Sequence, residues 1–77
     1  MKKVAIVTGG SHGIGYAIVE TLLNEQYQVF NLDIVPGELG EYRECDVSQV
    51  ATVKHVIQTI LSTTGRIDLL ESNAVPH

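Results

Sequence analysis

The apolar residues of this chain fall into short continuous runs, separated by longer stretches in which they recur every three or four positions. Segment 3–8 is apolar at four consecutive positions, 4–7, which is typical of a strand buried on both faces of a parallel sheet. Residues 28–33 and 67–72 form two further short segments that read as strands, and a shorter strand is predicted at 41–45.

Two stretches between these segments have the periodicity of amphipathic helices. The first begins near Gly13, and its predicted apolar face holds Ile14, Ala17, Ile18, Thr21 and Leu22. In the second, Ser48 stands where an N-cap is expected, and Gly65 stands where the helix should stop. The predicted apolar face of this second helix holds Val50, Val53, Val56, Ile57, Ile60 and Leu61.

The predicted element order is β-α-β-β-α-β. Strands and helices that alternate through short loops are typical of an α/β fold, with a mostly parallel sheet covered by helices. A ferredoxin-like fold has the same element order but pairs its strands antiparallel. Residues 34–41 contain Pro36, Gly37 and Gly40 and are predicted to be a loop. No linker or repeat divides residues 1–77, so we expect no second domain.

Four glycines lie between the first strand and the first helix, at Gly9, Gly10, Gly13 and Gly15. Glycine lets the main chain approach a ligand closely, and the start of a helix offers unpaired N–H groups to a phosphate. Asp33 ends the next strand, 20 residues after Gly13. This combination is typical of a dinucleotide-binding site, with phosphate at the glycines and ribose at the acid. It favours the parallel fold over the ferredoxin-like one.

The spacing Thr8-Gly9-x-x-x-Gly13-x-Gly15 resembles the glycine loop of the short-chain dehydrogenase/reductase family. Asp33 stands where that family has its ribose-binding acid, and residues 45–47 (Cys-Asp-Val) resemble its acidic dipeptide beside the adenine. Residues 65–74 resemble the segment that leads into its Asn-Asn-Ala-Gly motif, from which the chain departs at 72 (Ser) and 75 (Val). The resemblance implies the N-terminal part of a Rossmann-type NAD-binding domain, an incomplete three-layer parallel sheet.

The resemblance also implies which residues contact the cofactor: Gly9, Ser11, His12, Gly13, Ile14, Gly15, Asp33, Asp46, Val47, Asn73 and Ala74. An Asp33 carboxylate that accepts both ribose hydroxyls favours NAD over NADP. At 4 Å and an effective dielectric constant of about 20, it would repel a 2′-phosphate by about 4 kcal/mol per unit charge. No Lys or Arg near Ser11, His12 or Ile34 compensates for this charge.

The activity implied by the resemblance is hydride transfer between a nicotinamide and an alcohol or carbonyl substrate. In the family, a Tyr-x-x-x-Lys pair and a Ser transfer the proton. Here Tyr16, Tyr27 and Tyr42 are followed four residues later by Glu, Asn and Asp, so no catalytic residue is predicted. Two alternatives stay open: a stand-alone nucleotide-binding module without catalysis, and a non-catalytic interaction fragment that uses the uncovered sheet edge at 67–72.

Composition and charge exclude several classes of protein function. The 77 residues carry a net charge of −4, with a pI near 5.1, and the five basic residues are scattered. This argues against a surface for nucleic acid or an anionic membrane. No segment has the apolar length of a signal peptide or a membrane span. Cys45 is alone and the three histidines are far apart, so neither a disulfide nor a metal site is predicted. We expect a cytoplasmic protein, and the resemblance implies a homo-oligomer.

Overall fold

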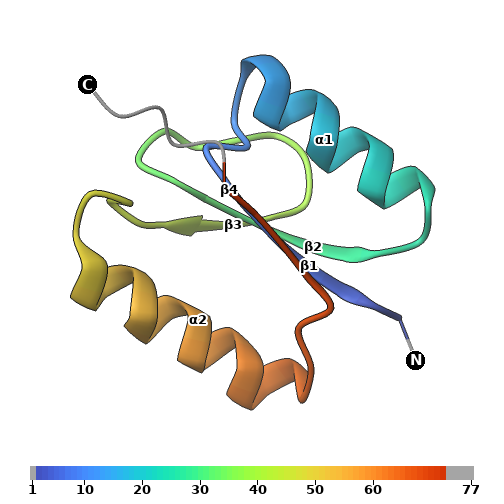
Figure 1. Cartoon of the computed structure of the whole chain (residues 1–77). Coiled ribbons are helices and arrows are strands. Elements are labelled where there is room, and N and C mark those ends of the chain that lie inside the picture. Colours follow the sequence, from blue (N-terminus) through green and yellow to red (C-terminus); the bar gives the residue numbers. More distant parts are fainter. Residues whose placement is uncertain (1, 73–77) are drawn as a thin grey trace.

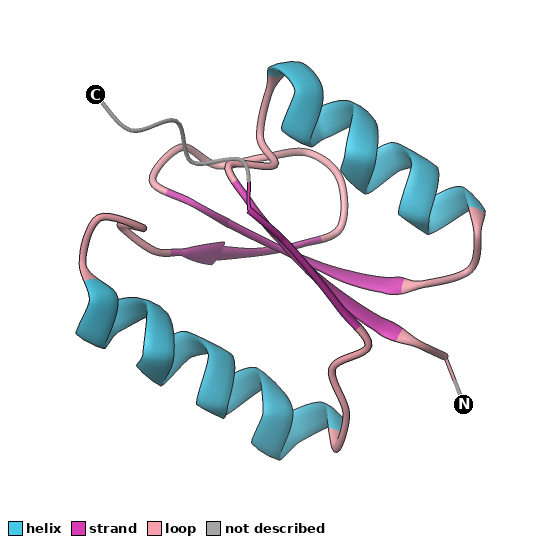
Figure 2. Ribbon diagram, in the orientation of Figure 1, coloured by secondary structure: helices cyan, strands magenta, loops and turns pink. Residues whose placement is uncertain are grey.

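The computed structural model describes residues 2–72, which form four strands and two helices in the predicted order (Figure 1). The strands are β1 (Val4–Thr8), β2 (Gln28–Asp33), β3 (Glu41–Glu44) and β4 (Leu69–Ser72). The helices are α1 (Gly13–Asn24), between β1 and β2, and α2 (Val50–Thr64), between β3 and β4. Figure 2 shows how loops join these elements at both ends of the sheet.

The four strands form one parallel sheet in the order β3-β2-β1-β4. In this register Thr8 lies opposite Leu32 on one side and Ser72 on the other, so the carboxyl ends of β1, β2 and β4 meet at one edge. The chain runs outward from β1 through β2 to β3 and then crosses to the other side of β1. Such a reversal of direction is where open α/β sheets bind ligands. The predicted parallel sheet is confirmed, and a ferredoxin-like arrangement is excluded.

Helices cover both faces of the sheet, α1 on one and α2 on the other (Figure 1). Because side chains alternate between the faces of a strand, β1 contributes to two apolar clusters and is buried at every position. The cluster under α2 contains Val4, Ile6, Phe30, Leu32, Cys45 and Ile60. The cluster under α1 contains Ala5, Val7, Val19, Leu22 and Val29. The predicted three-layer arrangement is therefore confirmed, and Cys45 is a buried core residue.

The predicted apolar face of α1 is partly wrong. Its buried residues are Gly15, Val19 and Leu22, whereas Ile14 is 77% exposed and both Ala17 and Thr21 are exposed. The side of α1 that meets the sheet is therefore shifted from the predicted stripe. Gly15 sets this orientation, because it packs directly against the main chain of Gly9.

The helix α2 departs from prediction at both ends of its apolar face and at its N-cap. Val50 is 66% exposed and Leu61 is 46% exposed, so only the middle of the face reaches the core. The N-cap is Gln49 instead of Ser48, and it makes no side-chain capping bond. The Ser48 side chain bonds to Asp46 in the preceding turn. The stop at Gly65 is confirmed, since this residue is the C-cap with a left-handed φ of 80°.

The connection into β4 is held by a charged pair. The Val4 N–H donates to Asp68 Oδ2 at 2.8 Å, and the Arg66 guanidinium binds the same carboxylate through two nitrogen atoms at 2.8 and 2.6 Å. Hydrogen bonding to Arg66, and then to Val4, lowers the pKa of Asp68 to about 2. These contacts hold the start of β1 against the segment before β4. The strand β4 begins at Leu69, two residues later than predicted.

Candidate nucleotide-binding site

The glycine loop connects the carboxyl end of β1 to the start of α1. Gly9 and Gly13 have left-handed φ angles of 67° and 62°, which side chains other than glycine rarely adopt. At Gly15 an added Cβ would lie 2.0 Å from the carbonyl oxygen of Gly9, so only glycine fits there. The Gly9 N–H donates to the carbonyl of Leu32 at 2.8 Å, which attaches the loop to β2. These three glycines thus form a tight turn after β1. The first turn of α1 packs against the main chain of this loop.

The exposed part of this loop consists of predicted cofactor residues. His12 is the N-cap of α1, in an extended conformation and without a side-chain capping bond. His12, Gly13 and Ile14 are exposed, and Ser11 is half-buried. Because the first N–H groups of an α-helix have no partner within the helix, this end of α1 can receive an anion.

Asp33 lies beside the glycine loop, as the sequence predicts. It is only 8% exposed. Its carboxylate accepts hydrogen bonds from the N–H of Ser11 and the N–H of Val35, both at 3.2 Å. The Tyr42 hydroxyl donates to its main-chain oxygen at 3.0 Å. Each carboxylate oxygen can accept a further hydrogen bond, so Asp33 can still bind the hydroxyl groups of a ligand.

Sequence reasoning missed Asn31, which is buried on β2 beneath the loop. Its Oδ1 accepts the Gly10 N–H at 2.9 Å, and its Nδ2 donates to Ser11 Oγ at 2.9 Å. The Ser11 hydroxyl in turn donates to the carbonyl of Val35. The available signal was an amide side chain between two apolar residues of this strand, Phe30 and Leu32.

Asp46 and Val47 follow β3, at the same edge of the sheet as Asp33. The Cys45 N–H donates to the main-chain oxygen of Asp33 at 3.0 Å, so this segment starts next to the site. The exposed Asp46 carboxylate accepts the Ser48 hydroxyl at 2.7 Å and the Ser48 N–H at 3.0 Å. These bonds, first the side-chain one, lower the pKa of Asp46. The Asp46 carboxylate thus forms the turn that leads into α2.

The remaining predicted contacts, Asn73 and Ala74, lie outside the described residues. The neighbouring Ser72 ends β4 beside β1, where the Thr8 hydroxyl donates to Ser72 Oγ at 3.5 Å. Within residues 2–72, no three His, Cys, Asp or Glu side chains form a group that could hold a metal ion. No helix in this part of the chain is long and apolar enough to cross a membrane.

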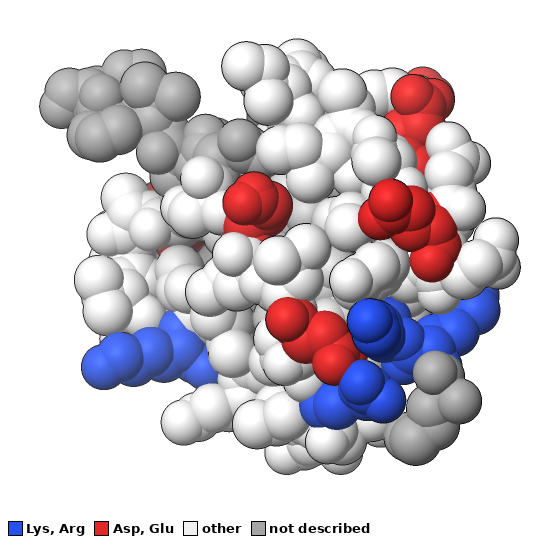
Figure 3. All heavy atoms as spheres, turned by 45° about the vertical axis from the view of Figure 1, so that its right-hand side comes forward, with Lys and Arg blue, Asp and Glu red and all other residues white. Residues whose placement is uncertain are grey.

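The charged side chains of the described residues do not form one continuous surface on the face seen in Figure 3. Most of that face is uncharged; one basic side chain lies at the lower left, and other basic side chains lie together at the lower right, beside an acidic one. A polyanion such as nucleic acid is normally bound by clustered Lys and Arg. On this face the basic side chains at the lower right adjoin an acidic one, and they cover only a small part of the surface.

The parallel order β3-β2-β1-β4, with a glycine turn after β1 and an acid at the end of β2, defines an α/β domain of the Rossmann type. A family model described as short chain dehydrogenase matches residues 3–75. The chain therefore belongs to the short-chain dehydrogenase/reductase family, as its glycine loop suggested.

Known members of this family match nearly all of the chain. Sorbitol-6-phosphate 2-dehydrogenase of Klebsiella pneumoniae is 38% identical over 78 residues, covering 94% of this chain and 29% of that protein. Aldohexose dehydrogenase of Thermoplasma acidophilum, solved in ligand-free form, is 43% identical with a TM-score of 0.91, covering 95% of this chain and 29% of that one. The chain thus spans 29% of the length of each of these two relatives.

A third protein shares the fold at lower identity. The short-chain dehydrogenase of Leptospira borgpetersenii, solved with bound NAD+, has a TM-score of 0.79 and 24% identity, covering 91% of this chain and 30% of that one. All three of these matched proteins are named as dehydrogenases.

Proposed function

We propose that this chain binds the adenosine end of NAD, as part of an oxidoreductase that transfers hydride between the nicotinamide and an alcohol or carbonyl substrate. The observation that carries the proposal is the contact between the glycine loop and Asp33, made by the Ser11 N–H and the Asp33 carboxylate at 3.2 Å. It brings together the two groups that a dinucleotide requires, an anion-binding turn and a ribose-binding acid.

The conformation of the glycine loop supports a role for it in holding the pyrophosphate. Gly13 has a left-handed φ of 62°, yet an added Cβ there would meet no atom within 4 Å. Contacts inside the protein therefore do not fill the space next to Gly13. A ligand that approaches the main chain closely would require both the conformation and the space. The residues present thus fit a pyrophosphate.

Asp33 supports the preference for NAD. Its two bonds from Ser11 and Val35 fix the carboxylate while leaving lone pairs for the ribose hydroxyls. Neither Ser11, whose N–H bonds the Asp33 carboxylate, nor the chain neighbours His12 and Ile34 is a Lys or Arg that could neutralise a 2′-phosphate. When bound, NAD would supply the hydride acceptor, whereas this chain's own residues bind and orient its adenosine end.

A calorimetric titration of the chain with NAD tests this proposal. We expect a saturable heat of binding at one site per chain, together with a rise in the melting temperature of the protein, because a ligand that binds only the folded state stabilises it. NADP should bind more weakly by at least about tenfold, since about 1.4 kcal/mol of repulsion from Asp33 suffices for that factor. Absence of both the heat and the melting shift would refute nucleotide binding by this chain.

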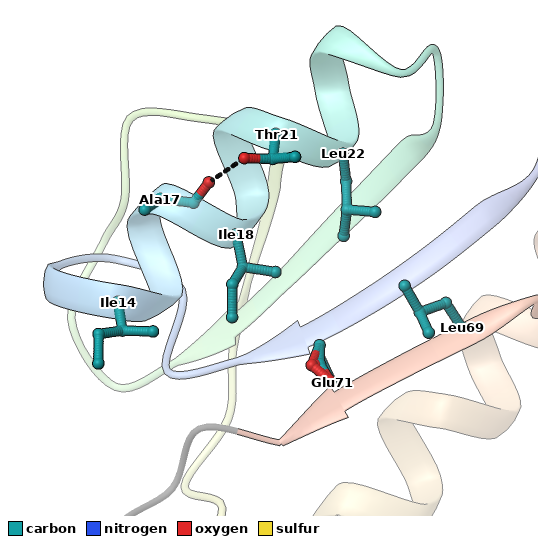
Figure 4. A pocket seen from close by; sticks show the side chains of 7 residues that line it. All are labelled: Ile14, Ala17, Ile18, Thr21, Leu22, Leu69 and Glu71. Carbon is teal, nitrogen blue, oxygen red and sulfur yellow. Dashed lines mark hydrogen bonds between the residues drawn. The ribbon is translucent and has the colours of Figure 1, made fainter.

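One observation favours the interaction alternative as a second candidate. Within residues 2–72 the strand β4 pairs only with β1, and an apolar groove lies between it and α1 (Figure 4). The groove is lined by Ile14, Ala17, Ile18, Thr21, Leu22, Leu69 and Glu71. Exposed side chains of α1, among them Ile14 and Ala17, thus line this groove together with the core residue Leu22. If the chain works through this surface alone, sedimentation should detect oligomers in the absence of nucleotide.

A further inference from the structure

Asn31 occupies an unusual position for an amide side chain. It is fully buried, in the middle of β2, on the face that α1 covers. A buried amide is costly unless it is hydrogen-bonded. Both of its polar atoms have partners, and both partners belong to the glycine loop: Gly10 N–H at 2.9 Å and Ser11 Oγ at 2.9 Å. Asn31 therefore attaches this loop to the sheet at two adjacent residues.

The hydrogen bonds continue from the glycine loop into the loop after β2. Ser11 donates its hydroxyl hydrogen to the carbonyl of Val35, while Asp33 accepts the N–H groups of both Ser11 and Val35. Asn31 and Asp33 stand two residues apart on one face of β2, so side chains from the same strand hold both loops. A change at Asn31 would reach Asp33 through Ser11.

Close packing at two glycines indicates that this arrangement has little freedom. A Cβ added to Gly37 would lie 2.5 Å from Asn31 Nδ2 and 2.8 Å from Ser11 Oγ. A Cβ added to Gly10 would lie 2.6 Å from Asn31 Oδ1. The main chains of both loops thus lie directly against the amide, and a side chain of different shape would displace them.

We propose that Asn31 is a positioning residue of the nucleotide site, which acts through Ser11 to hold the glycine loop and the loop after β2 around the Asp33 carboxylate. This inference rests on the proposed function, since the ligand concerned is the adenosine diphosphate end of NAD. A loop that is already ordered before the ligand arrives loses less conformational entropy on binding. Asn31 therefore contributes to affinity without touching the ligand.

The test is Asn31→Leu, which keeps a similar volume and removes both hydrogen bonds. In the ligand-free chain, amide hydrogen exchange followed by NMR should show Gly10 losing protection by about tenfold or more relative to Gly9. Gly9 is the internal reference because its N–H bonds the main chain of Leu32 instead of a side chain. Calorimetry should show NAD affinity reduced by about tenfold.

Two further variants separate positioning from general stability. Val29→Ala changes a buried residue on the same face of the same strand, but one that belongs to the apolar cluster. It should accelerate exchange at Gly9 and Gly10 alike and leave NAD affinity of the folded chain unchanged. Ser11→Ala removes only the bonds of the Ser11 hydroxyl, to Asn31 and to the Val35 carbonyl, and should fold readily. It should preserve the protection of Gly10 and weaken NAD binding severalfold.

The outcomes distinguish this inference from the proposed function. If Asn31→Leu leaves the ratio of Gly10 to Gly9 exchange unchanged, Asn31 does not hold the loop and the inference is wrong. If the ratio changes while NAD affinity does not, the loop is held but not for the nucleotide, which also overturns it. If Asn31→Leu does not fold, unchanged NAD affinity in Ser11→Ala overturns it. If the unmodified chain does not bind NAD, the proposed function fails, and the nucleotide role of Asn31 fails with it.

Discussion

Replacing Gly15 with alanine should destabilise this protein by about 3 kcal/mol, the upper end of the usual cost of overpacking a well-packed site. The added Cβ would lie 2.0 Å from the carbonyl oxygen of Gly9 and 2.8 Å from its carbonyl carbon. Both are main-chain atoms, so no side chain can rotate away to make room. Either α1 must move from the sheet or the glycine loop must open.

The direction of this stability change is informative, because helix propensity alone predicts that Gly15→Ala stabilises the protein. Within a helix, alanine is more favourable than glycine by about 1 kcal/mol. Urea denaturation of Gly15→Ala and of Gly13→Ala, as a matched control, measures the difference. At Gly13 the added Cβ meets nothing, and only the left-handed backbone opposes it, at about 1–2 kcal/mol. If Gly15→Ala is as stable as the unmodified chain, the described contact between α1 and the loop is wrong.

Replacing Asp33 with alanine should reduce NAD affinity by at least about tenfold, because hydrogen bonds to a charged group contribute about 1.5–3 kcal/mol each. The same change removes the negative charge that would repel a 2′-phosphate. The preference for NAD over NADP should therefore narrow or disappear. Calorimetric titration of the variant with both cofactors measures the two effects in one protein.

The ratio of the two affinities separates the ribose role from a loss of structure. Asp33→Ala also leaves the N–H groups of Ser11 and Val35 without their acceptor, which lowers stability and weakens both cofactors equally. Glu44→Gln is a suitable control, since Glu44 lies opposite Asp33 in the sheet and is exposed. It removes one negative charge nearby and should leave the ratio unchanged. An equal loss of NAD and NADP affinity in Asp33→Ala would count against its contact with the ribose.

The layers of the fold were predictable because β1 is apolar at consecutive positions, as a strand covered on both faces must be. The faces of the helices were less predictable, because periodicity alone does not fix which side meets the sheet. In α1 the close contact of Gly15 with Gly9 decides the orientation, and this contact exists only after the loop folds. Ile14 and Thr21 are turned instead toward the groove beside β4 (Figure 4).

The site residues that stand at fixed distances from strand and helix ends could be predicted from the sequence. Those that depend on contacts between distant parts of the chain could not. The glycines and Asp33 were found because their positions relative to strand and helix ends are fixed. Asn31 was not, because its partners Gly10 and Ser11 are about twenty residues away, as the intervals of 21 and 20 show. Ser48 is a different case, because the bond that occupies its hydroxyl is local: the acceptor is Asp46, two residues earlier, and this bond competes with helix capping.

The central claim is that the glycine loop and Asp33 together hold the adenosine end of NAD. The most direct measurement compares the amide NMR signals of the chain with NAD, ADP-ribose or nicotinamide mononucleotide added. We predict that NAD and ADP-ribose shift the signals of residues 9–15 and 33–35, and that nicotinamide mononucleotide leaves them unchanged. Shifts confined to the groove between α1 and β4, or none with any of the three, would contradict this account.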